Sequence, residues 1–280
     1  MYLFEPLYNK NIRTGIEKHR GAQRTTEKER FHMDILKSII VWFIGICYVV
    51  ITFPLTLVVW LLTLPFDRNR AIIHCFLMQQ SLIISYVMPI WTIHMQGRDK
   101  AMKGATYVII SNHQSLLDIL LINCLRYNFK WISKIENFKV PVIGWYLKMA
   151  DYIIVDRGNE ESKAEMLEKS LDCLKKEISI MIFPEGTRSP DNEIGFFKRG
   201  AFQLALQAGV PILPVLIDGT GGILPKHGLI FGSGHHITIK VLNPIYPANF
   251  GTDIPEDLAK ELSLFMTSEL KELRARNKQQ

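Results

Sequence analysis

The stretch YVIISNHQSLLD, residues 107–118, decides the fold class of this chain. Its first five residues, Tyr107 to Ser111, form a short apolar run that is typical of a buried strand. A few polar residues follow, and residues 115–125 are then apolar almost all round, which is typical of a buried helix. A strand that leads directly into a helix is a building unit of α/β proteins, in which helices cover a sheet.

The same alternation continues on the C-terminal side of this stretch. Short apolar runs predict strands near residues 130–133, 152–155, 180–183, 212–217 and 237–241. Helical spacing of apolar residues predicts helices near 160–178, near 199–208 and from Pro255 onward. We therefore expect an α/β domain with a central mixed sheet covered by helices.

The chain on the N-terminal side of this stretch has the composition of a membrane anchor. From Ser38 to Phe66 no residue is charged, and at about 1.5 Å per residue one straight helix would exceed the ~30 Å core of a bilayer. Pro54 can kink it, basic residues flank it on both sides, and residues 71–95 are again mostly apolar. A monotopic two-helix anchor with both ends cytoplasmic is favoured, and a single crossing is the alternative.

These patterns divide the chain into three parts. Residues 1–32 are expected to form a polar, poorly ordered N-terminal segment, residues 33–98 the membrane-anchoring helices, and residues 99–280 the α/β domain. The formal net charge of +6 suits an anionic membrane or anionic substrates. Since no nucleic-acid motif is present, we expect no nucleic-acid partner. Neither the four cysteines nor His235 and His236 have the spacing of a metal site, so we expect no metal.

His113 and Asp118 are the first candidates for chemistry. An i,i+5 pair does not share a helix face, so the two side chains meet only if His113 lies in the turn before the helix and Asp118 in its first turns. A carboxylate on one imidazole nitrogen fixes the tautomer and leaves the other nitrogen free as a base, which could deprotonate a substrate hydroxyl. Taken alone, this spacing is more typical of a helix-capping cluster.

A second candidate site follows another predicted strand, in FPEGTRS, residues 183–189. Gly186 permits close approach to the backbone, and Arg188 offers a planar fork for a phosphate or a carboxylate. Lys134 and Arg157 also follow apolar runs and are further candidate phosphate contacts, although such residues are individually more often surface charges. The chain has no G-x-S-x-G elbow, which argues against an α/β-hydrolase.

Together these stretches resemble the glycerolipid acyltransferase family, typified by the 1-acylglycerol-3-phosphate acyltransferases, over about residues 100–225. Asn112-His113 to Asp118 matches the NHxxxxD signature of that family, and residues 183–189 match FPEGTRS without a change. The other matches are Lys134 ahead of a Pro-x-x-Gly-Trp element, Arg157 in Ile-Val-Asp-Arg, and the apolar motif at residues 210–215. The polar segment at residues 1–32 is not part of the family pattern.

The resemblance implies acyl transfer to the sn-2 hydroxyl of lysophosphatidic acid, giving phosphatidic acid in phospholipid biosynthesis. The donor would be an acyl thioester of coenzyme A or acyl carrier protein, a co-substrate, with no cofactor required. His113 would be the general base and Asp118 its orienting partner. The phosphate would be held by Lys134, Arg157 and Arg188, in a site shaped by Glu185, Gly186 and Thr187. Glycerol-3-phosphate or another lysophospholipid is an alternative acceptor, and a non-catalytic membrane lipid-binding protein is a distant alternative.

Overall fold

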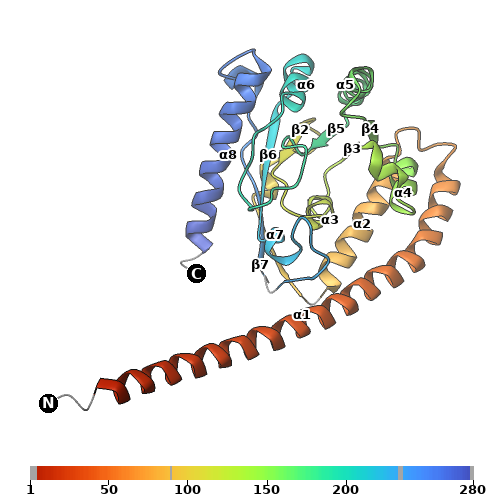
Figure 1. The fold of residues 1–280 in the computed structure, drawn as a ribbon. Helices are drawn as coiled ribbons and strands as arrows, with labels where there is room; N and C mark the ends of the chain where they lie inside the picture. The colour runs from red at the N-terminus through yellow and green to blue at the C-terminus, as the bar shows by residue number, and fades with distance from the viewer. Residues whose placement is uncertain (1–4, 89, 233–235, 278–280) are drawn as a thin grey trace.

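The structure, a computed structural model, describes residues 5–88, 90–232 and 236–277, with side chains from Lys28 onward (Figure 1). Seven strands form one sheet in the order β1-β7-β6-β2-β5-β3-β4. Their bounds are β1 Thr92–Gln96, β2 Val108–Ser111, β3 Phe129–Lys134, β4 Ile153–Val155, β5 Ser179–Ile182, β6 Ile212–Asp218 and β7 His236–Val241. The β6–β7 pair is antiparallel and the other pairs are parallel, which confirms the mixed sheet.

Helices cover both faces of this sheet. Apolar residues of α5, α6 and α8 form one buried cluster with the sheet, and those of α1, α2, α3 and α4 form the other. Their bounds are α1 Glu5–Thr63, α2 Ala71–Val87, α3 Leu117–Asn123, α4 Ile143–Met149, α5 Glu160–Lys175, α6 Gly200–Ala208, α7 Thr220–Ile223 and α8 Pro255–Asn277. The central strands β2, β5 and β6 are therefore buried on both faces, as their unbroken apolar sequences predict.

The N-terminal region differs from the sequence prediction in the structure of its first residues. Residues 5–32, expected to be poorly ordered, belong to α1, which is one helix from Glu5 to Thr63. Pro54 lies inside this helix and does not end it, and Figure 1 shows that α1 is curved and that its N-terminal half projects away from the α/β domain. Residues 1–4 lie outside the described part. Lys28–Thr63 is long and apolar enough to cross a membrane, and only 11% of its most apolar window is buried.

The boundary between anchor and domain also lies elsewhere than the sequence suggests. The second apolar stretch was expected to be helical to about residue 95, but α2 ends at Val87 and β1 follows at Thr92–Gln96. β1 pairs with β7 at one edge of the sheet, so the sheet begins before residue 99. α2 is also joined to the domain by polar contacts: Nδ1 of the buried His74 contacts the Tyr152 hydroxyl at 2.7 Å, and Asn123 donates to Ser81.

Candidate functional site

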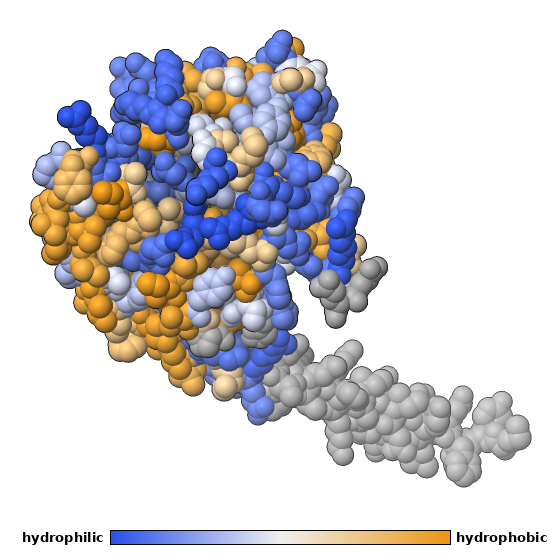
Figure 2. Space-filling view, turned by 180° about the vertical axis from the view of Figure 1, so that it is seen from behind, coloured by the Kyte–Doolittle hydropathy of each residue, from blue (hydrophilic) through white to orange (hydrophobic). Residues whose placement is uncertain are grey.

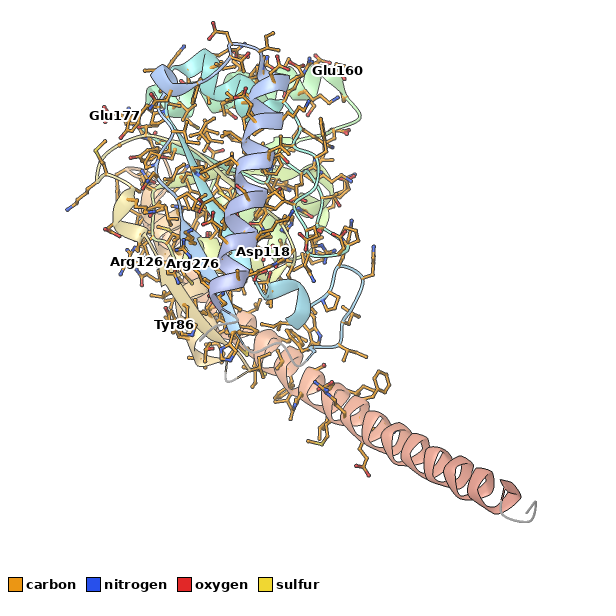
Figure 3. All side chains as sticks on the ribbon, turned by 90° about the vertical axis from the view of Figure 1, so that its left-hand side faces the viewer. Tyr86, Asp118, Arg126, Glu160, Glu177 and Arg276 are labelled. Carbon is orange, nitrogen blue, oxygen red and sulfur yellow. The ribbon has the colours of Figure 1, made fainter. Side chains whose placement is uncertain are left out.

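The sheet brings His113 and Asp118 together where β2 ends. β2 stops at Ser111, residues 112–116 form a turn, and α3 begins at Leu117. His113 lies in this turn and Asp118 in the first turn of α3, so that His113 Nδ1 lies 2.8 Å from Asp118 Oδ2. This is the arrangement that the spacing requires if the pair is to meet. Asp118 is labelled in Figure 3, where it lies within the α/β domain and far from the projecting half of α1.

The Asp118 carboxylate is fully buried and fully hydrogen-bonded. Besides His113, its Oδ2 accepts bonds from the backbone N–H groups of Gln114 and Ser115, at 2.7 and 2.8 Å. Its Oδ1 accepts a 2.6 Å bond from the hydroxyl of Thr220. Hydrogen bonds to a carboxylate favour its charged form and offset the cost of burial. Asp118 thus caps the turn and also holds the His113 ring through Nδ1. The catalytic role of the pair stays a prediction.

His113 is held both by its ring and by its backbone. It stacks on Phe183, with ring centroids 3.9 Å apart and planes 8° from parallel. Its backbone N–H donates to Glu185 at 2.9 Å, and its carbonyl accepts from the Ser189 N–H at 2.7 Å. Within the described residues, Nε2 makes no hydrogen bond, so the nitrogen opposite Asp118 is free for a substrate. These bonds place the FPEGTRS loop directly beside the histidine.

Several residues that support this turn were not assigned a role by the sequence. The Asn112 side chain bonds to both backbone groups of Ile217 on β6, accepting at 2.9 Å and donating at 2.8 Å. The hydroxyl of Ser115 donates to the carbonyl of Leu224 at 2.8 Å. Asn112 lies within the recognised signature, which is a sequence signal for its importance. Thr220 had no such signal, because it lies more than 100 positions from Asp118.

Glu185 is part of the support for His113 rather than an exposed ligand. Its carboxylate accepts from the N–H of His113 through Oε1 and from the N–H of Gly195 through Oε2. Burial raises the pKa of this carboxyl, while the two N–H donors act in the opposite direction. Glu185 therefore joins the His113 turn to the segment at residue 195. The expectation that it shapes a phosphate site stays a prediction.

Basic side chains gather around Gly186. This residue has a φ of +72°, a left-handed conformation that favours glycine, and its carbonyl accepts a hydrogen bond from Arg157. Burial lowers the pKa of Arg157, and the charge of Glu136 opposes this shift. The Lys198 side chain lies against Gly186 on another side, where a Cβ atom would come within 3.0 Å of its Nζ. Lys198 is thus a further basic group beside Gly186.

The remaining predicted residues are held less firmly. Lys134 ends β3 and forms a 2.7 Å ion pair with Glu136, with 45% of its side chain exposed. Arg188 is partly exposed and, within the described residues, has no hydrogen bond or ion pair. Thr187 is exposed between Gly186 and Arg188. The structure brings Arg157, Gly186 and Arg188 to the loop beside His113, whereas Lys134 approaches this group through Glu136, whose charge acts on Arg157.

No metal cluster is found among the residues that the structure describes: no group of three or more His, Cys, Asp or Glu side chains could hold an ion. His235, considered in the sequence, lies outside this part. The expectation that catalysis needs no metal or cofactor stays a prediction.

Comparison with known proteins extends the resemblance found in the motifs. Residues 92–218 match the family model described as Acyltransferase. This stretch of the α/β domain, from β1 to the end of β6, is therefore similar to the acyltransferase family. A chloroplastic 1-acyl-sn-glycerol-3-phosphate acyltransferase from Brassica napus is 36% identical over 72% of this chain and 61% of its own length. One from Arabidopsis thaliana is 39% identical over 58% of this chain and 46% of its own length.

A solved structure also has a fold similar to that of this chain. The 1-acyl-sn-glycerophosphate (LPA) acyltransferase from Thermotoga maritima is 25% identical, with a TM-score of 0.70 over 86% of this chain and 98% of that protein. This chain spans about half to three-fifths of the plant relatives. The similarity includes the site, because the family match runs from β1 to the end of β6 and so contains His113, Asp118 and the FPEGTRS loop.

Proposed function

We propose that this protein transfers a fatty acyl group from an acyl thioester to the sn-2 hydroxyl of lysophosphatidic acid, giving phosphatidic acid. The observation that carries the proposal is the 2.8 Å contact between His113 Nδ1 and the buried Asp118 carboxylate, with Nε2 unbonded beside a basic loop. A base next to cationic groups suits an acceptor that bears both a hydroxyl and a phosphate. The names of the plant and Thermotoga relatives support the same acceptor.

Binding of the acceptor is assigned to the basic groups around Gly186. Arg188 binds the phosphate through its unpaired guanidinium, and Arg157 adds charge from the end of β4. Lys134 lies further out and contributes from its pair with Glu136. Because Ser189 and Glu185 bond to the backbone of His113, a phosphate held in this loop keeps the rest of the acceptor close to Nε2.

The chemical step is a proton transfer coupled to acyl transfer. An alcohol hardly ionises near neutral pH, so His113 Nε2 takes the hydroxyl proton as the oxygen bonds to the thioester carbonyl carbon. The tetrahedral intermediate then collapses and the carbon–sulfur bond breaks. The leaving thiolate takes this proton from His113 and departs as the thiol of coenzyme A or acyl carrier protein. Asp118 stabilises the transient imidazolium and holds its tautomer.

The proposal is tested by turnover with radiolabelled acyl-CoA and acyl carrier protein donors. The acceptors are lysophosphatidic acid, glycerol-3-phosphate and lysophosphatidylcholine, and the products are separated by thin-layer chromatography. We expect labelled phosphatidic acid from lysophosphatidic acid, and little product with the other two. Transfer to glycerol-3-phosphate alone, or no transfer by folded protein, would contradict the proposal.

We further propose that α1 and α2 hold the enzyme on the cytoplasmic face of a membrane, with both ends of the anchor on that face. Basic residues on both sides of the apolar segment support this placement. The test is Arg20→Cys in a background without the native cysteines, probed with a membrane-impermeant thiol reagent on sealed vesicles. When the reagent is added on the non-cytoplasmic side, we expect the cysteine to stay unlabelled until the vesicles are permeabilised. Labelling from that side would show that α1 crosses.

A further inference from the structure

The segment that leads into α4 carries apolar side chains that the domain does not bury. Val140, Ile143 and Trp145 are all exposed, Ile143 to 52% and Trp145 to 50%. Single exposed apolar residues are ordinary, but a contiguous group on one short turn marks an interaction site. The chain at this point is Lys139-Val-Pro-Val-Ile-Gly-Trp145, so the group follows β3 after only a short 3-10 turn, Ile135–Lys139.

The backbone of this turn is held in an unfavourable conformation. Val142 has a φ of 64°, which is strained for a β-branched residue. Gly144 packs so closely on the Phe138 carbonyl that a Cβ atom would lie 2.1 Å from that oxygen. Its N–H also donates to the Val140 carbonyl at 2.8 Å. Strain of this kind persists where surrounding contacts enforce it, which is common at functional sites. The turn therefore presents its apolar side chains in a fixed arrangement.

The apolar side chains continue onto α1. The Trp145 ring lies 5.3 Å from that of Phe53, between centroids. An apolar hollow separates the two helices, and its walls come from both: Phe53, Leu57, Trp60, Trp145, Lys148 and Met149. In Figure 2, apolar residues cover the left-hand side of the molecule below its top. This side is the right-hand side of Figure 1, where the C-terminal half of α1 and α4 lie. We call this the α1–α4 surface.

The charged side chains that directly flank the apolar residues along the chain are both basic. Lys139 and Lys148 are exposed on either side of the apolar residues, and no acidic residue lies between Glu136 and Asp151. Apolar side chains flanked by lysines suit the boundary of an anionic bilayer, where the apolar groups enter the acyl region and the ammonium groups stay among the phosphates. A protein partner would need an acidic, apolar face, and the continuity with α1 favours lipid.

We propose that the α1–α4 surface docks on the leaflet of an anionic phospholipid membrane, with Val140, Ile143 and Trp145 inserted and a lipid acyl chain in the hollow. The three inserted side chains lie outside the anchor helices α1 and α2, and this contact does not depend on the proposed reaction. Because β3 ends at Lys134 just before this turn, docking places the edge of the candidate acceptor site at the lipid surface.

The test places a fluorescent, environment-sensitive probe on Val140→Cys and, separately, on Ile143→Cys. Cys47, Cys75 and Cys173 are replaced by alanine, and Cys124 is kept because it is only 1% exposed. The control is Leu264→Cys on α8, an exposed apolar position at 64% exposure on another side of the domain. Each labelled protein is added to phosphatidylcholine vesicles with and without phosphatidylglycerol, some carrying a nitroxide on the acyl chain.

The expected result is a blue shift and nitroxide quenching at positions 140 and 143, stronger with phosphatidylglycerol, and neither effect at position 264. If the protein floats with the vesicles while all three probes respond alike, the proposal is overturned. Protection of positions 140 and 143 without vesicles, rising with protein concentration, would show an interface between copies of the chain and would also overturn it. Using two probe positions keeps the test valid if one variant does not fold.

A separate observation concerns Thr220, at the start of α7. Its side chain is fully buried, and its hydroxyl is the partner of Asp118 Oδ1 among the described residues. The last torsion of an aspartate side chain is soft, so bonds to one oxygen alone do not fix the carboxylate plane. The Thr220 bond on Oδ1 fixes that plane and keeps Oδ2 directed at His113 Nδ1.

We infer that Thr220 is a positioning residue for the pair His113 and Asp118, an inference that rests on the proposed role of His113 as the base. Thr220→Val should lower kcat about tenfold or more with little change in either KM, since the lost bond orients the base and does not touch the acceptor. Thr220→Ser, which keeps the hydroxyl, should restore most of kcat. Thr238→Val, at a buried threonine on β7 that bonds to Asn277, is the matched control and should keep the parental kcat.

The outcomes separate this inference from the proposed function. Parental kcat in folded Thr220→Val, or a loss that Thr220→Ser does not restore, would overturn the positioning role. Full turnover in His113→Ala would instead overturn the function on which it rests. If Thr220→Val does not fold, Thr220→Cys takes its place, because a thiol is a weak donor of similar size.

Discussion

Asp118, in the first turn of α3, and Arg188, in the FPEGTRS loop, belong to neighbouring segments joined by the hydrogen bond between His113 and Ser189. The structure holds their two side chains in opposite ways. The Asp118 carboxylate is fully buried and accepts four hydrogen bonds. The Arg188 guanidinium is partly exposed and, within the described residues, has no partner. A group that orients a base must be in place before the substrate arrives. A group that binds a phosphate can be left unpaired, because the ligand supplies the partner.

The largest expected effect is the loss of the base. His113→Ala should lower kcat roughly 10²- to 10⁴-fold, the usual contribution of a general base. Asp118→Asn should be milder, because Asp118 only orients the imidazole. Rates are measured under saturating donor and acceptor, and circular dichroism checks the fold. Near-parental turnover by folded His113→Ala would show that the pair of His113 and Asp118 does not carry the chemistry.

Glu185 resembles Asp118 rather than Arg188, because its carboxylate is buried and already hydrogen-bonded. The sequence grouped it with the candidate phosphate-binding residues. An amide accepts through only one of its two heavy atoms, so Glu185→Gln leaves one buried N–H, of His113 or Gly195, without its bond. We expect a loss of about 1–3 kcal/mol in the free energy of unfolding and a lower kcat. Urea unfolding and steady-state rates measure both. A change in the acceptor KM alone would show that Glu185 acts in acceptor binding and does not support His113.

The pH dependence of stability gives a second test of Glu185. Burial raises the pKa of this carboxyl in the folded protein, so the folded state binds its proton more readily than the unfolded state. Its contribution to stability is therefore present at acidic pH and is lost as the pH rises through the folded pKa. The difference in unfolding free energy between the parent and Glu185→Gln should shift in favour of the parent as the pH falls. A difference that does not vary with pH would contradict the raised pKa.

Arg188→Ala should act on binding and leave the preorganised pair untouched. A charge-assisted contact contributes about 1.5–3 kcal/mol, so the KM for the acceptor should rise roughly tenfold to a hundredfold, with the donor KM unchanged. Arg276→Ala on α8, at an exposed pair with Glu272, is the matched control and should change neither. A rise in the donor KM alone would assign Arg188 to the thioester pocket.

The smallest effect is expected at Lys134. Its ammonium already pairs with Glu136, and nearly half of the side chain is in solvent, where ion contacts contribute about 0–1 kcal/mol. Lys134→Ala should therefore raise the acceptor KM less than about fivefold. The same kinetics as for Arg188→Ala measure it. An effect as large as that of Arg188→Ala would mean that the phosphate displaces Glu136 and that the two basic residues act as equals.

The sequence predicted the elements with strong local patterns and failed where the pattern was short. Apolar runs located β2 to β7, and the apolar spacing near residues 160–178 located α5, which the Asn159 side chain caps. β1 was missed because its residues continue the apolar stretch that contains α2. α4 was missed because it has only seven residues and follows the strained residue Val142. The disorder expected for residues 5–32 rested on composition, which does not exclude the extension of a helix already formed at Lys28–Thr63.

Local sequence by itself determined the fold class and the candidate site residues, because strand-and-helix alternation and the NHxxxxD and FPEGTRS motifs depend on residues close together in the chain. Only the tertiary structure decided how those side chains are supported. The bonds from Thr220 to Asp118, from Asn112 to Ile217 and from Glu185 to His113 each join segments that lie far apart in the sequence. They exist because β2, β5 and β6 are neighbours in one sheet, and that order is fixed by packing rather than by local propensity.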